Sequence, residues 1–236
     1  FQISRTWYFL HEEEQPGEEE EKRYMGLIGK RGEHIPLQQL THEAYFYGLR
    51  FYVDENVLAP RPDTEILVEQ VLENLPEDQE MEILDLCTGS GCILLSILAN
   101  RQNARGTGAD LSEKALAVAE RNGRDLGIKA RWLHGDLFEK IQGQYDVVVS
   151  NPPYIRTDVI QGLMEEVRLH EPYMALDGHE DGLYFYRKII VQAGGYLKPG
   201  GLLAFEIGYD QGEAVSSLMK EQGYRQVQVV KDLAGL

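Results

Sequence analysis

Predicted strands and helices alternate from Met81 to the end of the chain, and this alternation constrains the fold more than any other feature of the sequence. Short apolar and β-branched stretches predict strands at 82–88, 105–111, 130–136, 145–151, 202–208 and 225–233. Apolar residues at helical spacing predict helices at 91–101, 112–127, 182–197 (with the KPGG segment, 198–201, as its stop) and 210–223. This pattern is typical of a doubly wound α/β fold with a mostly parallel sheet, whose ligand crevice lies at the carboxyl ends of the strands.

Two shorter regions precede the main domain, which we expect to span residues 61–236. Residues 1–44 contain glutamates around a Pro-Gly break, which predicts a short helix, an acidic turn and a second helix at 17–30. We expect this N-terminal helical region to be incomplete. Residues 45–60 are aromatic and β-branched on either side of a glycine, which predicts a β-hairpin linker.

The main domain begins with a proline-rich stretch and a helix. Pro60 and Pro62 stiffen the chain ahead of residues 63–75, which have apolar residues at helical spacing. Thr64 is predicted to cap this helix.

The composition argues against several classes of protein. With 39 acidic and 23 basic residues the formal net charge is −16, which disfavours direct binding to nucleic acid because phosphate attraction needs clustered cations. The longest apolar run, 92–99, is too short to span a bilayer. Cys87 and Cys92 lack redox or zinc spacing, and the histidines show no ligand pattern. We therefore expect a cytoplasmic protein with reduced thiols and no metal or membrane association.

A glycine-rich turn, 85–92 (DLCTGSGC), follows the first predicted strand of the domain. Glycines there let the backbone approach a ligand, and the following helix N-terminus favours negative charge. The turn lacks the third glycine of a dinucleotide fingerprint, because Leu94 occupies that position. A nicotinamide dinucleotide is therefore the less favoured ligand.

Acidic residues stand at successive strand ends, and they favour one cofactor. Asp110 ends the second strand, where an acid can grip ribose hydroxyls, and Asp136 ends the third, where it can accept from an adenine amine. Each aspartate alone is better explained as a helix or turn cap. Together with Asp85 in the glycine turn, they predict S-adenosylmethionine, with S-adenosylhomocysteine as its product.

The fourth strand of the domain ends in an unusual segment, NPPY (151–154), and is expected to lie beside the first strand. The Asn151 side-chain oxygen and the Pro152 carbonyl can accept both hydrogens of a planar NH2 group, while Tyr154 covers its face. Because both hydrogens are then held in the plane, the nitrogen lone pair points perpendicular to it, toward a methyl donor.

The NPPY segment after the DLCTGSG turn resembles the Rossmann-like class I methyltransferases that act on planar nitrogens. The segments APRPDTEILVE, EPYMALDGHEDGL, LKPGGLLAFEIG and DQGEAV are similar, more narrowly, to the HemK/PrmC family of peptide chain release factor glutamine methyltransferases. The likeness covers residues 24–235. It implies methyl transfer to the side-chain amide nitrogen of the glutamine in the GGQ motif of class 1 release factors, which would be the protein partners.

The resemblance also implies roles for particular residues. The cofactor would be bound by Cys87, Thr88, Gly89, Ser90, Gly91, Asp110, Asp136, Leu137 and Asn151. The substrate glutamine would be held by Asn151, Pro152, Pro153 and Tyr154, of which Asn151, Pro152 and Tyr154 are the catalytic set. Its entrance would be lined by Arg61, Pro62 and Glu65.

Three departures from the family pattern stand out. Cys87 occupies a position where the family more often has glycine, so the backbone there must tolerate a side chain. The N-terminal helical region is shorter than the family's, and the chain stops before the last strand that such sheets carry.

Three alternative functions compete with glutamine methylation of a release factor. An adenine-N6 nucleic-acid methyltransferase uses the same kind of NPPY segment to hold the amine of a flipped base. The acidic net charge of this chain disfavours such an enzyme. A glutamine methyltransferase acting on a ribosomal protein is closer, and the PRPDTE segment favours the release-factor branch. A cofactor-binding module without activity is disfavoured because every catalytic position holds a competent residue.

Overall fold

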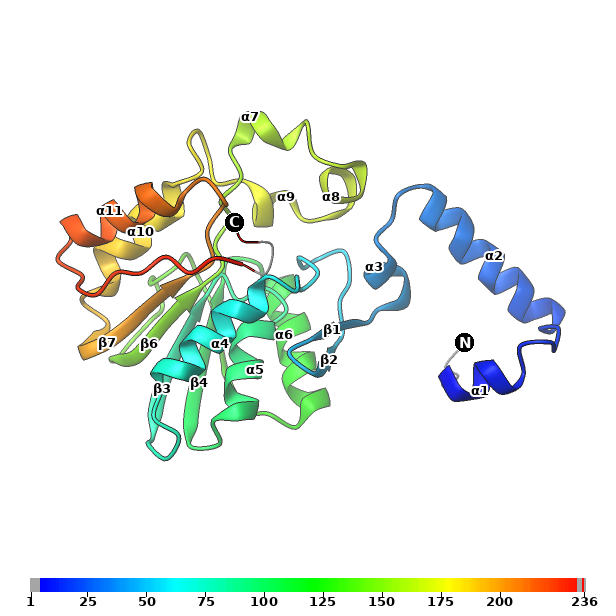
Figure 1. Ribbon diagram of the computed structural model, residues 1–236, viewed down its shortest axis with the longest axis horizontal. Coiled ribbons are helices and arrows are strands. Elements are labelled where there is room, and N and C mark those ends of the chain that lie inside the picture. The colour runs from blue at the N-terminus through cyan, green and yellow to red at the C-terminus, as the bar shows by residue number, and fades with distance from the viewer. Residues whose placement is uncertain (1–4, 233–234, 236) are drawn as a thin grey trace.

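A computed structural model describes residues 5–232 and residue 235 (Figure 1). Its main sheet has the order β5-β4-β3-β6-β7, and all of its pairings are parallel. The strands are β3 (Met81–Leu86), β4 (Ala104–Asp110), β5 (Arg131–His134), β6 (Tyr145–Ser150) and β7 (Leu197–Phe205). The strand order reverses between β3 and β6, so the predicted doubly wound fold is confirmed and β6 lies beside β3 as expected.

Helices cover both faces of this sheet (Figure 1). One face carries α4 (Thr64–Asn74), α5 (Cys92–Asn100) and α6 (Glu113–Leu126); the other carries α10 (Tyr184–Ala193) and α11 (Gly212–Glu221). Successive residues of β3 point to opposite faces, so Ile83 packs in the core with α4 and α5 while Leu84 packs in the core with α10. Both side chains are fully buried, as expected for a parallel sheet covered on both sides.

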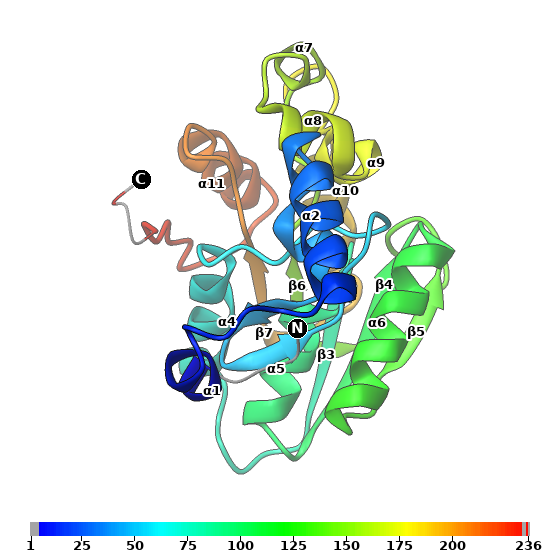
Figure 2. The ribbon, with the colours of Figure 1, turned by 90° about the vertical axis from the view of Figure 1, so that its right-hand side faces the viewer.

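The N-terminal region is helical, as predicted. It contains α1 (Arg5–Leu10), α2 (Glu18–Gly32) and an unpredicted short helix, α3 (Leu37–Thr41). Helix α2 extends away from the main body, and none of its residues is buried (Figures 1 and 2). The region is attached through α8 (Glu165–His170): Arg31 pairs with Glu166 at 2.6 Å, and the Gln39 amide donates to the His170 carbonyl at 2.8 Å.

The predicted hairpin is formed by β1 (Ala44–Phe46) and β2 (Leu49–Phe51). Both turn residues, Tyr47 and Gly48, have positive φ, which is typical of a two-residue turn that matches the strand twist. The flanking Phe46 and Phe51 are buried in the same core as α4 and α5. The hairpin therefore connects the two regions and also packs onto the main sheet domain.

Residues 155–183, for which no secondary structure was predicted apart from the start of a helix at 182, lie between the NPPY segment and α10. This segment contains the short helices α7 (Thr157–Ile160), α8 and α9 (Tyr173–Leu176), which lie above the carboxyl edge of the sheet (Figures 1 and 2). One turn of this segment is tied to the strand tip, because the Ile155 N–H donates to the Leu176 carbonyl and the Gly178 N–H donates to the Ile155 carbonyl. The segment is thus placed to cover a ligand bound at the strand ends.

Two predictions near the C-terminus are wrong. Residues 225–232 form no strand, and residue 233 of the predicted strand lies outside the described residues. Val229 instead lies against the start of α11, where a Cβ on Gly212 would be 3.2 Å from it. The KPGG segment does not stop a helix but lies inside β7, where Gly200 has a φ of +80° and the register with β6 shifts. A bulge accommodates these residues within a strand.

The predicted capping role of Thr64 is also wrong. Thr64 is the first helical residue of α4, and Asp63 occupies the N-cap position without a side-chain capping bond. The Thr64 side chain is buried, so it points into the body of the protein and not along the helix end.

Candidate active site

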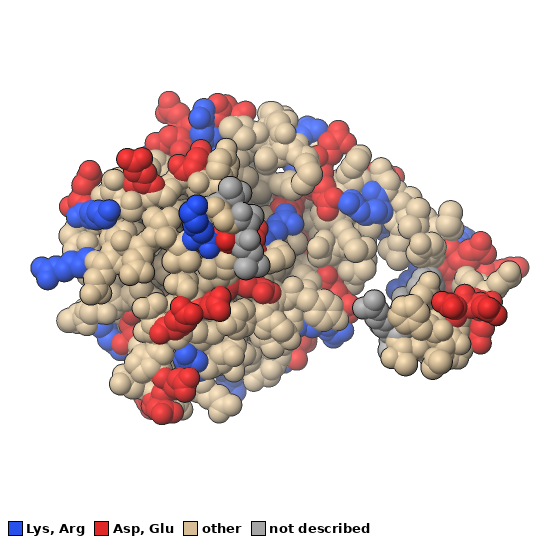
Figure 3. Space-filling model, viewed as in Figure 1, with Lys and Arg blue, Asp and Glu red and all other residues tan. Residues whose placement is uncertain are grey.

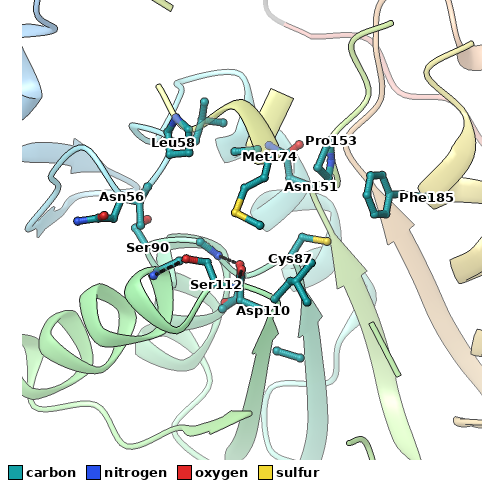
Figure 4. Close-up of a pocket in the computed structure, with 18 of the residues that line it drawn as sticks. Asn56, Leu58, Cys87, Ser90, Asp110, Ser112, Asn151, Pro153, Met174 and Phe185 are labelled. Carbon is teal, nitrogen blue, oxygen red and sulfur yellow. Dashed lines mark hydrogen bonds between the residues drawn. The ribbon is translucent and has the colours of Figure 1, made fainter. Parts of the chain in front are cut away.

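A pocket of about 340 Å³ opens at the carboxyl ends of β3, β4, β5 and β6 (Figure 4). Pockets of roughly 300–1,000 Å³ are typical of small-molecule sites. The predicted site residues that line it are Arg61, Cys87, Thr88, Gly89, Ser90, Asp110, Asp136, Leu137, Asn151 and Pro153. Five predicted residues do not line it: Pro62, Glu65, Gly91, Pro152 and Tyr154. Further parts of the wall that the sequence did not indicate include residues 56–60, 172–175 and Phe185.

The glycine turn joins β3 to α5 through three residues in the left-handed region. Cys87, Gly89 and Gly91 have φ values of +57°, +55° and +78°. A side chain at Gly91 would be crowded, because a Cβ there would lie 3.0 Å from the Trp132 ring and 3.2 Å from the Ala119 Cβ. Glycine at this position thus lets the turn pack closely against α6 and β5, and it aims the N-terminus of α5 at the pocket.

Asp110 fastens this turn from the end of β4. One carboxylate oxygen accepts from the Gly89 N–H at 2.9 Å, and the other accepts from the Ser112 N–H at 2.8 Å (Figure 4). Burial raises the pKa of Asp110, and these backbone hydrogen bonds oppose the rise. The carboxylate therefore caps backbone N–H groups, which is the role that the sequence suggested for a single aspartate. It also borders the pocket.

Asp136 was predicted to end the third strand, but β5 ends at His134 and Asp136 lies in the loop that follows. Its Oδ2 accepts from the Lys188 ammonium of α10 at 3.0 Å, a partner that the sequence did not reveal. Both side chains are partly exposed, so the pair is weakened by solvent. The next residue, Leu137, is buried and has a φ of +49°.

The NPPY segment leaves the end of β6 at the opposite wall of the pocket (Figure 4). Asn151 and Pro153 border the pocket itself, and Pro152 is buried. Tyr154 borders a second cavity, which shares Arg61 with the first, and its hydroxyl lies 3.4 Å from Glu206 Oε1. Burial raises the pKa of Tyr154, so its hydroxyl stays protonated at neutral pH.

Two glycines that the sequence did not single out hold the backbone of this segment. A Cβ on Gly178 would lie 2.7 Å from the Tyr154 Cα and carbonyl carbon, and one on Gly182 would collide with the Tyr154 carbonyl oxygen. The same carbonyl accepts from the Gln211 side-chain amide at 3.0 Å. The end of the NPPY segment is therefore fixed from three directions.

The predicted entrance residues are separated by the start of α4. Arg61 borders the pocket, and its guanidinium pairs with the Glu171 carboxylate at 2.6 Å. Pro62 is exposed. Glu65 faces the hairpin instead, where its carboxylate accepts from the Tyr47 N–H at 2.7 Å.

Neither cysteine has the electrostatics of a nucleophile. Burial raises the pKa of the Cys87 thiol, with Asp110 and Asp85 adding to the rise, and it raises the pKa of the Cys92 thiol to about 12. Both thiols are therefore protonated at neutral pH and weakly reactive. Among the residues that the structure describes, no group of three His, Cys, Asp or Glu side chains has the arrangement of a metal site.

Comparisons with known proteins agree with this geometry. Residues 62–168 match the family "Methyltransferase small domain", and residues 1–41 match the "PrmC N-terminal domain". A Caulobacter vibrioides protein named release factor glutamine methyltransferase is 47% identical, with 88% of this chain and 73% of the relative covered. A Clostridium acetobutylicum protein of the same name is 43% identical, with coverages of 90% and 76%.

Solved structures resemble the fold at low sequence identity. A methyltransferase from Pyrococcus furiosus gives a TM-score of 0.58 at 19% identity, covering 79% of this chain and 83% of that one. The T. thermophilus 16S rRNA N2 G1207 methyltransferase, solved with AdoMet and guanosine, gives 0.53 at 20% identity, with coverages of 76% and 44%. These likenesses support the Rossmann-like class I methyltransferase fold.

Proposed function

Because this chain belongs to the release factor glutamine methyltransferase family, we propose that it methylates the side-chain amide nitrogen (N5) of the glutamine in the GGQ motif of class 1 peptide chain release factors. The methyl donor is S-adenosylmethionine. The observation that carries the proposal is the position of Asn151, which borders the same pocket as the glycine turn and Asp110.

The residues of the pocket fit S-adenosylmethionine. The open position at Gly89, the N-terminus of α5 and the carboxylate of Asp110 suit a ligand with a carboxylate, a ribose and a cationic sulfur. Asp110 would hold the ribose, and Asp136 with Leu137 would border the adenine. A dinucleotide fits less well, because Leu94 is fully buried beneath Gly106 of β4, where the fingerprint would have glycine.

The NPPY segment supplies the acceptors for a planar amide. The Asn151 side-chain oxygen and the Pro152 carbonyl would accept the two N–H bonds of the glutamine, with Pro153 and Tyr154 completing the slot. S-adenosylmethionine, when bound, supplies an electrophilic methyl group on a sulfonium. Orienting a weakly nucleophilic amide in this way can supply about 7–11 kcal/mol of the barrier reduction.

Surface charge favours a protein substrate over DNA. On the face shown in Figure 3, lysine and arginine side chains are scattered among acidic ones and form no continuous basic stripe. The net charge of −16 would repel a duplex, whereas a glutamine on a protein loop needs only the slot. An adenine methyltransferase is therefore the less favoured function, and the names of the relatives favour a release factor over a ribosomal protein as the substrate.

Among the described residues no helix is long and apolar enough to cross a bilayer. We propose that the protein acts in the cytoplasm, with release factors as its partners.

Incubation with labelled S-adenosylmethionine tests the proposal. The expected result is label in a class 1 release factor and none in its GGQ Gln→Ala variant, in DNA or in ribosomal proteins. Label in DNA, or label that survives the Gln→Ala change, would overturn it.

A further inference from the structure

Glu206 follows the last residue of β7 and lies next to the acceptor segment. Ser150 of β6 pairs with Phe205 of β7, and the Glu206 N–H donates to the Ser150 carbonyl at 3.1 Å. One step further along these parallel strands, Asn151 and Glu206 are therefore neighbours whose side chains leave the sheet on the same side.

The backbone of Glu206 is fixed on both sides. Its N–H is bound to β6, and its carbonyl accepts from the Tyr186 hydroxyl at 2.9 Å. Tyr186 is itself fully buried, so this anchor has little freedom to move. The position from which the Glu206 side chain projects is accordingly well defined.

The carboxylate of Glu206 points among polar side chains of the acceptor site. Oε1 lies 3.4 Å from the Tyr154 hydroxyl, and Oε2 is buried without a hydrogen-bond partner among the described residues. Burial is the largest influence on the pKa of Glu206 and raises it, while polar interactions with Thr64, Asn151 and Tyr154 oppose the rise. A buried carboxylate oxygen without a full set of partners is costly, so its retention calls for a role.

We propose that Glu206 is a positioning residue that fixes the orientation of the Asn151 amide and the Tyr154 hydroxyl for methyl transfer. The inference rests on the proposed function of the slot. An asparagine side chain presents an acceptor at one end and two donors at the other, and only its oxygen can accept from a substrate NH2. A carboxylate only accepts, so it attracts the Asn151 NH2 and leaves the Asn151 oxygen for the substrate. Accepting from that NH2 also polarises the amide and strengthens its oxygen as an acceptor.

Thr64 is a third polar side chain beside this carboxylate. Its side chain is buried at the start of α4, and its interaction with Glu206 favours the charged carboxylate. The PRPDTE, NPPY and FEIG segments, which are far apart in the sequence, thus meet at one carboxyl group.

Kinetics of Glu206→Gln test the proposal. A glutamine can turn its own NH2 toward Asn151 and so remove the preference for one amide orientation. The expected result is a kcat lower by about 10–100-fold, with the dissociation constant for S-adenosylmethionine unchanged within about two-fold. Glu206→Asp, which keeps the carboxylate, should retain more activity than Glu206→Gln, and the exposed Glu221→Gln should behave as the wild type. Equal activity of the Glu206→Gln variant and the wild type would overturn the proposal.

A double variant shows whether Glu206 acts through Asn151. In an Asn151→Ala background, Glu206→Gln should lower the rate by a smaller factor than in the wild type, because only its contact with the Tyr154 hydroxyl remains. The same fold loss in both backgrounds would mean that Glu206 acts elsewhere and would overturn the proposal.

A spectroscopic measurement separates this inference from the proposed function. In ¹⁵N NMR spectra the Asn151 side-chain NH2 signals should move in Glu206→Gln and stay in place in Glu221→Gln. This readout needs no methyl transfer, so unchanged signals would refute the role of Glu206 whatever the substrate. A wild-type protein that methylates no release factor, while these signals move, would refute only the proposed substrate.

Discussion

The Arg61 guanidinium lies 2.6 Å from the Glu171 carboxylate, and this ion pair joins the start of the main domain to the segment above the pocket. The Glu171 side chain is 1% exposed, and its second oxygen is buried without a partner among the described residues. Burial raises the pKa of Glu171, and the Arg61 guanidinium opposes the rise.

We therefore expect Arg61→Ala to lower the free energy of unfolding by about 1–3 kcal/mol, because it leaves a buried carboxylate unpaired. Urea denaturation at neutral pH measures the loss. The matched control is Arg50→Ala, which removes an exposed ion pair with Glu43 and should cost less than about 1 kcal/mol. Equal losses in the two variants would contradict the prediction.

The pH dependence of stability should report the buried Asp85. Burial raises its pKa to about 7, against a hydrogen bond from the Thr88 hydroxyl at 2.6 Å. Since the folded state holds this proton more tightly than the unfolded chain, the contribution of Asp85 to stability is full below about pH 4 and is lost as the pH rises through 7.

Asp85→Asn should remove this dependence and make the unfolding free energy flatter between pH 4 and pH 7 than in the wild type. Denaturant titrations at several pH values measure both slopes. An equally steep slope in the variant would show that other groups cause it.

Gly178→Ala should slow methyl transfer and spare cofactor binding. The new Cβ would lie 2.7 Å from the Tyr154 backbone, which must shift, and a displacement of about 1 Å can cost about 10²-fold in rate. Single-turnover rates and calorimetric titration with S-adenosylmethionine separate the two effects. Gly194→Ala is the control, because its Cβ would meet only the Tyr224 hydroxyl, at 3.9 Å. Comparable rates for both variants would contradict the prediction.

Asn151→Ala should lower kcat by about 10²-fold or more, because the lost oxygen orients the reacting nitrogen. The dissociation constant for S-adenosylmethionine should change little, as the glycine turn and Asp110 remain. The exposed Asn103→Ala serves as the control. An unchanged turnover in the Asn151 variant would refute the role assigned to this side chain.

Cys87 offers a test of backbone strain. A φ of +57° destabilises the fold by about 1–2 kcal/mol when the residue is not glycine. Glycine in turn lowers the free energy of unfolding by about 0.5–1 kcal/mol relative to alanine, because it gives the unfolded chain more conformational entropy. The strain is the larger effect, so Cys87→Gly should be more stable than Cys87→Ala by up to about 1 kcal/mol. Chemical denaturation of the two variants measures the difference. A more stable alanine variant would show that the turn relaxes.

The sequence predicted the elements that depend on local pattern. The parallel sheet and the position of β6 beside β3 follow from the alternation of strands and helices, and the pocket forms where the strand ends predicted it. Residues 225–232 show the limit of such patterns, because β-branched residues make a strand only where a neighbouring strand accepts their hydrogen bonds.

The remaining contacts of the site depend on partners far away in the sequence. Lys188 reaches Asp136 from α10, and Gly178 touches Tyr154 only because the chain returns over the strand tip. The family resemblance implied that Glu65 lines the entrance, but the first turn of α4 directs its side chain to the hairpin. No local pattern carries this information, since it arises from tertiary packing.

The cofactor side and the substrate side of the site differ in the sequence separation of the residues that form them. The glycine turn is fastened by Asp110, which is 21 residues from Gly89, whereas the surroundings of Asn151 are completed by Thr64 and Glu206 from more distant parts of the chain. Contacts between distant segments carry the larger loop-closure cost and form late. During refolding from urea, the protein should regain cofactor binding before it regains methyl transfer, and stopped-flow binding with quenched activity assays would resolve the two phases.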